Sequence, residues 1–373
     1  MNYDVVVIGA GAMGGAAACH LAREGQKTLL LEQFALDHPF GSSYGHSRII
    51  RYAYDHPAYI EMARKVFPMW ADLEAESGEA LYMRTGGLDF GRPDWPHFAA
   101  TRQSMLDQNI YFEELLPDEV TKRFPQFRLD EDMLGLFQPD AGLVRPSRTV
   151  KTLVRLAQQS GADFIDNCPV TRIEPSTNGV TVHTAHERYE AARLVVCAGS
   201  WAKTLLESTG LKLPLQPTRQ QLLFFESDDS RYDASQLPIY IFWDEVVYYG
   251  VGGADGGGFK CAQHGIDAPV TPDAVDRSHD PQYETRVRDF MRKHIPAMAE
   301  RPMIESRVCL YTMTPDEHFV IDRHPDYPHI AIAAGFSGHG FKFAPLVGRM
   351  LARLACGDAV EGDLTLFRAD RFV

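Results

Sequence analysis

The opening of the chain carries the feature that most restricts its fold. An apolar, β-branched run at residues 3–8 is followed by the hexapeptide GAGAMG at 9–14 and by an alanine-rich stretch at 16–23. Strand, glycine turn and helix are predicted in that order, and a second strand is predicted at 27–31. This arrangement is typical of a parallel α/β sheet that binds a dinucleotide.

Each glycine of the turn has its own role in such a unit. Gly9 permits the tight turn, Gly11 lets a pyrophosphate approach the backbone, and Gly14 lets the helix pack on the strand. Free N–H groups at the helix N-terminus then hold the phosphates. Glu32 ends the second strand 18 residues after Gly14, where a carboxylate binds ribose hydroxyls and disfavours a 2′-phosphate. The turn alone leaves NAD, NADP and FAD open, and Glu32 favours FAD or NAD.

A cysteine far along the chain narrows the choice of cofactor. Cys309 stands just ahead of a predicted strand, in the run VCLYTMTPDEH at 308–318. Together with the glycine turn it suggests a covalently held flavin, because a thioether on the flavin raises its reduction potential and prevents its loss. No two of the six cysteines form a CxxC pair, so neither a disulfide framework nor a zinc site is expected. The other five are expected to be reduced, buried thiols: Cys19, Cys168, Cys197, Cys261 and Cys356.

Two further strand–glycine segments, at 193–201 and 329–340, predict parallel strands that converge on the nucleotide. Strand-like runs at 220–225 and 246–251, with a glycine-rich loop at 252–258, predict an antiparallel sheet over a pocket. We therefore expect an α/β plus α+β protein with a Rossmann-like cofactor (FAD-binding) domain and a substrate domain. Their expected ranges are 1–85, 140–215 and 310–373 for the first, and 86–139 and 216–309 for the second.

Charge and hydropathy exclude several kinds of partner. The 373 residues contain 37 Lys and Arg against 50 Asp and Glu, a net charge of −13, so neither nucleic acid nor an anionic membrane surface is an expected partner. No apolar run approaches the ~18 residues of a transmembrane helix, and Asp4 stands where a signal peptide would carry positive charge. We expect a cytoplasmic protein. The spacings of His318, His324 and His339 match no helix-borne ligand pair, so no metal is expected.

Laid together, these segments resemble the monomeric sarcosine oxidase and N-methyltryptophan oxidase family of flavoproteins nearly end to end. The motifs that carry the resemblance are GAGAMG at 9–14, SRIIR at 47–51, YYG at 248–250, CLYT at 309–312, DEHF at 316–319 and GFSGHGFKF at 335–343. The resemblance implies a monomer with FAD joined through its 8α carbon to the sulfur of Cys309.

The resemblance also implies roles for individual side chains. Arg51 and Lys342 would hold the substrate carboxylate, and Arg48 would lie at the flavin ring. Because Arg48 and Arg51 are three apart, one helical turn would place both on the same side. Lys260 would stand near flavin N5 and assist oxygen. Two more residues would line the substrate site: His264 and Tyr249. Cofactor contacts are expected from Gly9, Gly11, Gly14, Glu32, Ser47, Arg48, Val170, Gly199, Cys309, Gly338, Gly340 and Lys342.

The chain departs from the family pattern at three places. The family commonly has His-His-Gly-Asp where this chain reads SYGH at 43–46, so Tyr44 replaces a residue expected close to the flavin. His56 stands where an acid is common. The run YIFW at 240–243 predicts a more aromatic pocket wall than a substrate as small as sarcosine requires.

The expected activity is flavin-dependent oxidation of the C–N bond of a secondary N-methyl amino acid such as sarcosine. Oxygen would be reduced to H₂O₂ and the imine hydrolysed to amine plus aldehyde. Alternatives on the same fold are oxidases of cyclic or larger secondary amino acids, such as pipecolate, proline, N-methyltryptophan or a fructosyl amino acid. A flavin dehydrogenase, a NAD enzyme and a non-catalytic binding protein are further alternatives. Lys260 argues against the dehydrogenase, Cys309 argues against the NAD enzyme, and a binding protein would need neither.

Overall fold

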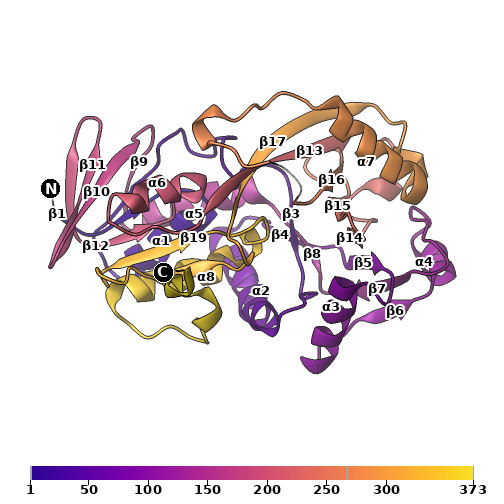
Figure 1. Ribbon diagram of the computed structural model, residues 1–373, viewed down its shortest axis with the longest axis horizontal. Helices are drawn as coiled ribbons and strands as arrows, with labels where there is room; N and C mark the ends of the chain where they lie inside the picture. The colour runs from indigo at the N-terminus through magenta and orange to yellow at the C-terminus, as the bar shows by residue number, and fades with distance from the viewer. Residues whose placement is uncertain (1, 266–267, 373) are drawn as a thin grey trace.

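The computed structural model describes residues 2–265 and 268–372. Its strands form two large sheets and one small one. Figure 1 shows an elongated molecule, with the first large sheet and both chain ends towards one end and the second large sheet towards the other. No helix within the described part of the chain combines the length and apolar character that a bilayer crossing requires.

The first sheet confirms the predicted parallel core around the glycine turn. Strand β1 lies between β2 and β12 and is parallel to both, and β19 is parallel to β12. Its strands come from three separate parts of the chain, within residues 2–31, 163–196 and 320–334. Their bounds are β1 Asn2–Ile8, β2 Thr28–Leu31, β9 Asp163–Ile165, β10 Val170–Ser176, β11 Gly179–Thr184, β12 Arg188–Val196, β18 Val320–Arg323 and β19 Ile330–Ala334.

Alternate residues of β1 enter two different cores. Val5 and Val7 pack with helices α1, α5 and α8, whereas Val6 and Ile8 pack with the β10–β11 side of the sheet and α6. A buried parallel strand is expected to be apolar on both faces, as this one is. The helices of the structure are α1 Ala12–Arg23, α2 Pro57–Ser77, α3 Pro96–Asp107, α4 Pro117–Arg123, α5 Pro146–Gln159, α6 Ala202–Glu207, α7 Pro281–His294 and α8 Ala344–Cys356.

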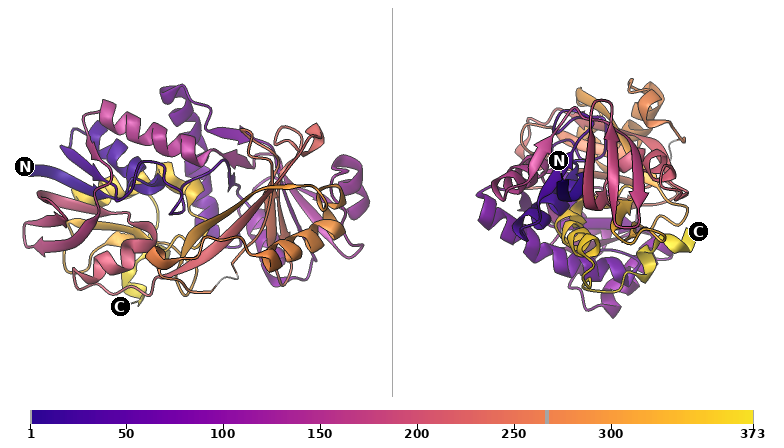
Figure 2. Two further views of the ribbon diagram at one scale, coloured as in Figure 1. Left: turned by 90° about the horizontal axis from the view of Figure 1, so that it is seen from above. Right: turned by 90° about the vertical axis from the view of Figure 1, so that its left-hand side faces the viewer.

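The second sheet lies over a cavity, as predicted, but it is not wholly antiparallel. Strands β14 and β5 pair in parallel, while the other neighbours in the sheet are antiparallel. The long strands β13 and β17 run from this sheet towards the first one (Figure 2). In sheet order the strands are β17 Met303–Met313, β13 Gln216–Phe225, β16 Phe259–Gln263, β15 Tyr248–Val251, β14 Ile239–Trp243, β5 Gly87–Gly91, β7 Leu134–Gln138 and β6 Glu113–Leu115.

The two faces of this second sheet differ in chemistry. On β14, Tyr240 and Phe242 enter an apolar core that helix α7 covers, whereas Ile241 and Trp243 line the cavity. The predicted aromatic wall at 240–243 is therefore wrong for half of its residues, because successive side chains of a strand point to opposite faces. On β16 the same alternation places Lys260 at the cavity.

The small sheet corrects a local prediction. Arg48 lies in strand β3, Arg48–Ile50, rather than on a helical turn, because this strand pairs antiparallel with β8, Gly142–Val144, which also pairs with β4, Tyr82–Arg84. The β-branched isoleucines of β3 favour that extended backbone. Three predicted boundaries near the N-terminus also shift: the first strand begins at residue 2 instead of 3, the first helix at 12 instead of 16, and the second strand at 28 instead of 27.

Candidate active site

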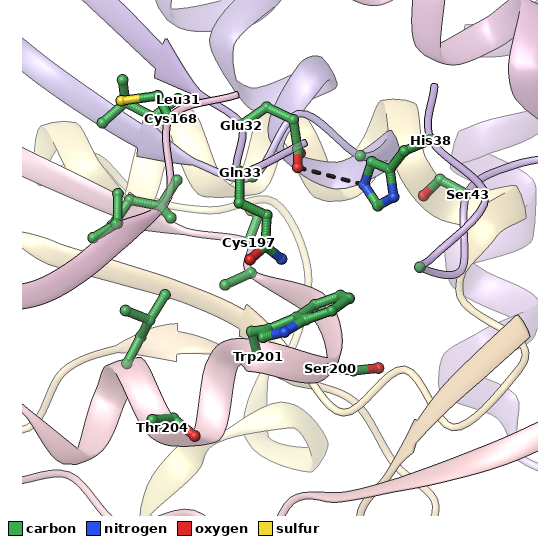
Figure 3. A pocket seen from close by; sticks show the side chains of 18 of the residues that line it. Leu31, Glu32, Gln33, His38, Ser43, Cys168, Cys197, Ser200, Trp201 and Thr204 are labelled. Atoms are coloured by element: carbon green, nitrogen blue, oxygen red, sulfur yellow. Dashed lines mark ion pairs between the residues drawn. The ribbon is translucent and has the colours of Figure 1, made fainter. Parts of the chain in front are cut away.

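A cavity of about 310 Å³ lies at the carboxyl ends of β1, β2 and β12 and brings together five predicted residues. A crevice beyond the carboxyl ends of parallel strands is where such sheets bind nucleotides. Figure 3 shows this cavity with Glu32, His38 and Trp201 around it. The predicted residues that line it are Gly9, Gly11, Glu32, Val170 and Gly199.

The glycines of the turn are required by close backbone contacts. Gly9 has φ +96°, and a Cβ there would lie 2.4 Å from the carbonyl oxygen of Cys197. A Cβ on Gly14 would lie 1.8 Å from the carbonyl oxygen of Gly9, which confirms that Gly14 lets α1 pack on the strand. Gly14 lines neither cavity. Its contribution is therefore to the shape of the turn.

Glu32 can still accept hydrogen bonds from a ribose. Its two carboxylate oxygens accept from the backbone N–H of Ala10 at 2.8 Å and of Phe34 at 3.1 Å, and Nε2 of His38 lies 3.4 Å from Oε1. A carboxylate offers about four lone-pair positions, so acceptor capacity is left for ribose hydroxyls. Ser43 Oγ accepts from Ala12 N–H at 3.1 Å at the start of α1. These contacts fit the nucleotide half of a dinucleotide.

The larger cavity has a volume of about 730 Å³ and gathers most of the predicted chemistry. It lies between the second sheet, strand β3 and the segment 338–342 that precedes α8. Ser47 and Gly340 line neither cavity. The predicted residues that line the larger cavity are Arg48, Arg51, Tyr249, Lys260, His264, Cys309, Gly338 and Lys342.

Arg48 holds the loop between the two cavities through backbone carbonyls. Its guanidinium donates to the carbonyl oxygens of Ser42 at 2.8 Å, Tyr44 at 2.9 Å and Ser47 at 2.9 Å. Within the described chain no carboxylate forms an ion pair with Arg48, so no negative side chain offsets its positive charge beside the cavity.

Lys260 is a buried cation site, with 3% of its surface exposed. Its Nζ lies 5.0 Å from the centre of the Tyr249 ring. Burial, together with the positive charge of Arg48, lowers the pKa of Lys260 from 10.5 to about 7. Desolvation likewise lowers the pKa of His264 to about 4, so its ring is neutral at pH 7. The Tyr249 hydroxyl lies 3.2 Å from that of Tyr311.

The lowered pKa of Lys260 predicts how stability depends on pH when the chain carries no cofactor. Between pH 7 and 10.5 the unfolded chain binds a proton at Lys260 that the folded chain does not, so stability rises with pH across this window. We expect Lys260→Met to abolish that part of the rise. Urea unfolding of cofactor-free wild type and Lys260→Met at pH 7, 8 and 9 checks this prediction. Free energies of unfolding that change with pH in parallel in the two proteins would contradict it.

Arg51 and Lys342 lie together in the cavity with different partners. Arg51 Nη1 donates to Asp89 Oδ1 at 2.8 Å in a buried ion pair. Lys342 Nζ donates to the Tyr54 hydroxyl and to the His339 carbonyl, each at 2.7 Å. Burial, with Arg51 nearby, sets the pKa of Lys342 well below 10.5. An anion bound between Arg51 and Lys342 would relieve this repulsion.

Cys309 faces the cavity from β17 and is 6% exposed. Burial raises the pKa of its thiol, and the charges of Arg48, Lys260 and Arg307 act against that rise. Nearby cations favour the thiolate, which is the nucleophilic form of cysteine. All six cysteines are free.

Two of the departures from the family pattern lie outside both cavities. The Tyr44 ring stacks 4.7 Å from the Arg307 guanidinium, and His56 caps helix α2 by accepting from Ala58 N–H at 3.2 Å. Neither residue lines a cavity.

Sequence reasoning missed several residues that the fold brings to the two sites. An acid inside the apolar run GLDFG at 87–91 was a usable signal for Asp89, since a charged residue is rarely buried without a partner. The others were not identified as site residues, although Ser43, Trp201 and Tyr311 lie within segments that the sequence singled out: His38, Ser43, Tyr54, His97, Trp201 and Tyr311.

Comparison with known proteins agrees with this geometry. The family model for FAD dependent oxidoreductases (DAO) matches residues 4–354. Monomeric sarcosine oxidase of Bacillus sp. (strain B-0618) is 36% identical over 377 residues, covering 99% of this chain and 96% of that protein. N-methyl-L-tryptophan oxidase of Salmonella arizonae is 31% identical over 388 residues, covering all of both chains.

A solved structure shows the same architecture. The open form of NikD, described as an unusual amino acid oxidase essential for nikkomycin biosynthesis, superposes with a TM-score of 0.88 at 26% identity, covering 99% of this chain and 97% of that one. The family match spans both the glycine turn and the residues of the larger cavity. The chain therefore belongs to the FAD dependent oxidoreductase family, and FAD is its cofactor.

Proposed function

We propose that this protein oxidises the C–N bond of a secondary N-methyl amino acid, with sarcosine as the simplest substrate, and reduces O₂ to H₂O₂. The observation that carries the proposal is one cavity in which Arg51 and Lys342 lie together while Lys260 and Cys309 line the same space. A carboxylate held by Arg51 and Lys342 would lie in the same cavity as Cys309, the proposed attachment point of the flavin. The relatives named for sarcosine and N-methyl-L-tryptophan support this substrate class.

When bound, FAD would supply the two-electron redox chemistry that links the C–N bond to O₂. The side chains of the protein bind the substrate and adjust the charge around it. Arg51 and Lys342 bind the substrate carboxylate, Arg51 through its planar fork of donors. His264, neutral because its pKa is lowered to about 4, adds no positive charge that would repel an incoming amine. Lys260, in its protonated form, supplies a positive charge where negative charge develops on oxygen.

The products follow from the atoms of the substrate. Oxidation of an N-methyl group gives an imine, and water converts it to formaldehyde and the primary amino acid. We propose that Cys309 holds the cofactor covalently and that the protein acts as a monomer, as the name of the monomeric relatives suggests.

The division into a FAD-binding domain and a substrate domain is also a proposal. The strands of the first sheet fall in the expected cofactor ranges, and those of the second sheet fall mainly in the substrate ranges. Strand β17, Met303–Met313, runs across the boundary expected at 309/310.

A peroxide assay tests the activity directly. We expect H₂O₂ and formaldehyde in equal amounts from N-methylglycine and from N-methyl amino acids with longer side chains. N-methylglycinamide, which lacks the carboxylate, should react far more slowly at the same concentration. An absence of peroxide with every N-methyl amino acid, from protein that retains its flavin, would refute the proposal.

Arg51→Ala tests carboxylate recognition. A charge-assisted hydrogen bond contributes ~1.5–3 kcal/mol, and ~1.4 kcal/mol corresponds to a factor of ten in affinity. We expect the dissociation constant of N-methylglycine to rise by roughly tenfold or more, measured from anaerobic flavin bleaching against substrate concentration. Arg64→Ala, at an exposed arginine, is the control. Unchanged binding in Arg51→Ala would remove this residue from the site.

A further inference from the structure

Asp89 is a buried acid that reaches the larger cavity only through other residues. It lies in β5 and is 1% exposed, between Leu88 and Phe90, which enter the apolar core. Its Oδ1 accepts two hydrogen bonds of 2.8 Å, from Arg51 Nη1 and from Trp243 Nε1. Both donors line the cavity, and Asp89 does not. One carboxylate oxygen thus joins the carboxylate-binding arginine to the aromatic part of the cavity wall.

The ion pair orients the Arg51 guanidinium. Within the described chain, Nη1 is the guanidinium atom of Arg51 with a protein hydrogen-bond acceptor, so Nε and Nη2 remain for a ligand. The guanidinium carbon lies 5.0 Å from the Tyr54 ring and 5.4 Å from the Trp243 ring. The Trp243 ring is itself packed against His97, with ring centres 4.6 Å apart. Trp243 is therefore fixed on one side by a ring contact and at its N–H by Asp89.

Asp89 also sets the charge that a ligand meets. Arg51 is compensated by Asp89, whereas Lys342 has no carboxylate within ion-pair distance among the described residues. Burial raises the pKa of Asp89, and Arg51 and the Trp243 hydrogen bond act against that rise. With Asp89 ionised, this corner of the cavity carries at most one uncompensated positive charge. A ligand with one carboxylate matches it.

We propose that Asp89 is a positioning residue for substrate recognition: it holds Arg51 with two donors turned to the cavity, and its charge limits how tightly Arg51 binds a carboxylate. This inference rests on the proposed function for the nature of the ligand, and it has two separable parts. The tether improves carboxylate binding by fixing geometry. The negative charge weakens it by repelling a second carboxylate on the same guanidinium.

Two variants of Asp89 separate the tether from the charge. Asp89→Asn keeps the shape and one acceptor oxygen but removes the charge, so acetate should bind about threefold to tenfold more tightly than to wild type. Asp89→Val keeps a similar volume and favours a strand but removes the acceptor. It should bind acetate ~10-fold more weakly than Asp89→Asn, since Arg51 is no longer held.

Acetate is the probe, and its dissociation constant is read from the flavin absorbance of the holoenzyme. The titration needs no turnover, so a wild type that oxidises no N-methyl amino acid would refute the proposed function and leave this test intact. With N-methylglycine as substrate, KM should follow the acetate constants while kcat changes less than about twofold.

The matched control is Glu284→Gln, at a partly buried acid paired with Arg288 and His279 outside both cavities. It should leave the acetate constant and KM unchanged. Equal acetate constants in wild type and Asp89→Asn would overturn the role of the charge, and equal constants in the Asn and Val variants would overturn the tether. If Asp89→Val does not fold, the comparison of wild type with Asp89→Asn still tests whether the charge of Asp89 weakens carboxylate binding. A variant that raises kcat and leaves KM unchanged would overturn the role of Asp89 as a positioning residue.

Discussion

Replacing Lys260 with methionine should slow the oxygen half-reaction by ~10²–10³-fold, the usual loss when one preorganised electrostatic contact is removed. Lys260 is buried in β16 and lines the larger cavity. Methionine keeps a similar length and apolar character but carries no charge. The anaerobic half-reaction with substrate should change much less, because Arg51 and Lys342 remain in place.

The environment of Lys260 explains why the effect should be large. Arg48 also lines this cavity, and among the described residues its guanidinium donates to backbone carbonyls and pairs with no carboxylate, so the two cations repel each other. The repulsion between Lys260 and Arg48 is already present in the folded protein before oxygen binds. Negative charge that develops on oxygen then meets a cation that needs no reorganisation.

Stopped-flow traces of both half-reactions check this prediction. The wild-type oxygen step should slow as the pH rises through the pKa of Lys260, and the Met variant should show no such slope. Lys203→Met, at an exposed lysine of α6, is the control for the substitution itself. Unaltered reoxidation in Lys260→Met would make the lysine a bystander, and slow reoxidation of the wild type would favour a dehydrogenase.

The parts of the fold that sequence predicts are those where local signals agree. The strand, turn and helix at residues 2–23 follow from a continuous apolar, β-branched run, a glycine turn and an alanine-rich stretch, all within one short segment. Parallel strands at 193–196 and 330–334 were predicted because apolar runs ended in glycine. In each case the residues that decide the structure are neighbours in the chain.

The errors arise where a distant segment decides the structure. Arg48 lies in a strand because β8, more than ninety residues later, pairs with β3. The three-residue spacing of Arg48 and Arg51, which would fit a helical turn, therefore does not determine where these two residues lie. The ion pair of Arg51 with Asp89 joins β5 to the residue after β3, and no pattern in either segment indicates the other. A single sequence shows that an acid is buried, but not which cation it meets.

Replacing Cys309 with alanine should completely abolish covalent retention of the flavin. We expect the wild-type precipitate in trichloroacetic acid to stay yellow, and the flavin of Cys309→Ala to pass entirely into the supernatant. The cofactor should still bind reversibly, because the glycine turn and Glu32 at the smaller cavity are unchanged. Absorbance of pellet and supernatant, with mass spectrometry of the intact protein, provides the measurement.

Cys261→Ala is the control, because both thiols are buried in the same sheet and differ in the face they occupy. Cys261 enters the apolar core under α7, whereas Cys309 faces the cavity among cations that favour its thiolate. A thiol on the core face cannot reach a flavin bound on the other side of the sheet. Flavin that remains in the pellet of Cys309→Ala would assign the attachment to another residue, and flavin lost from Cys261→Ala would mean that the sheet, rather than one sulfur, retains it.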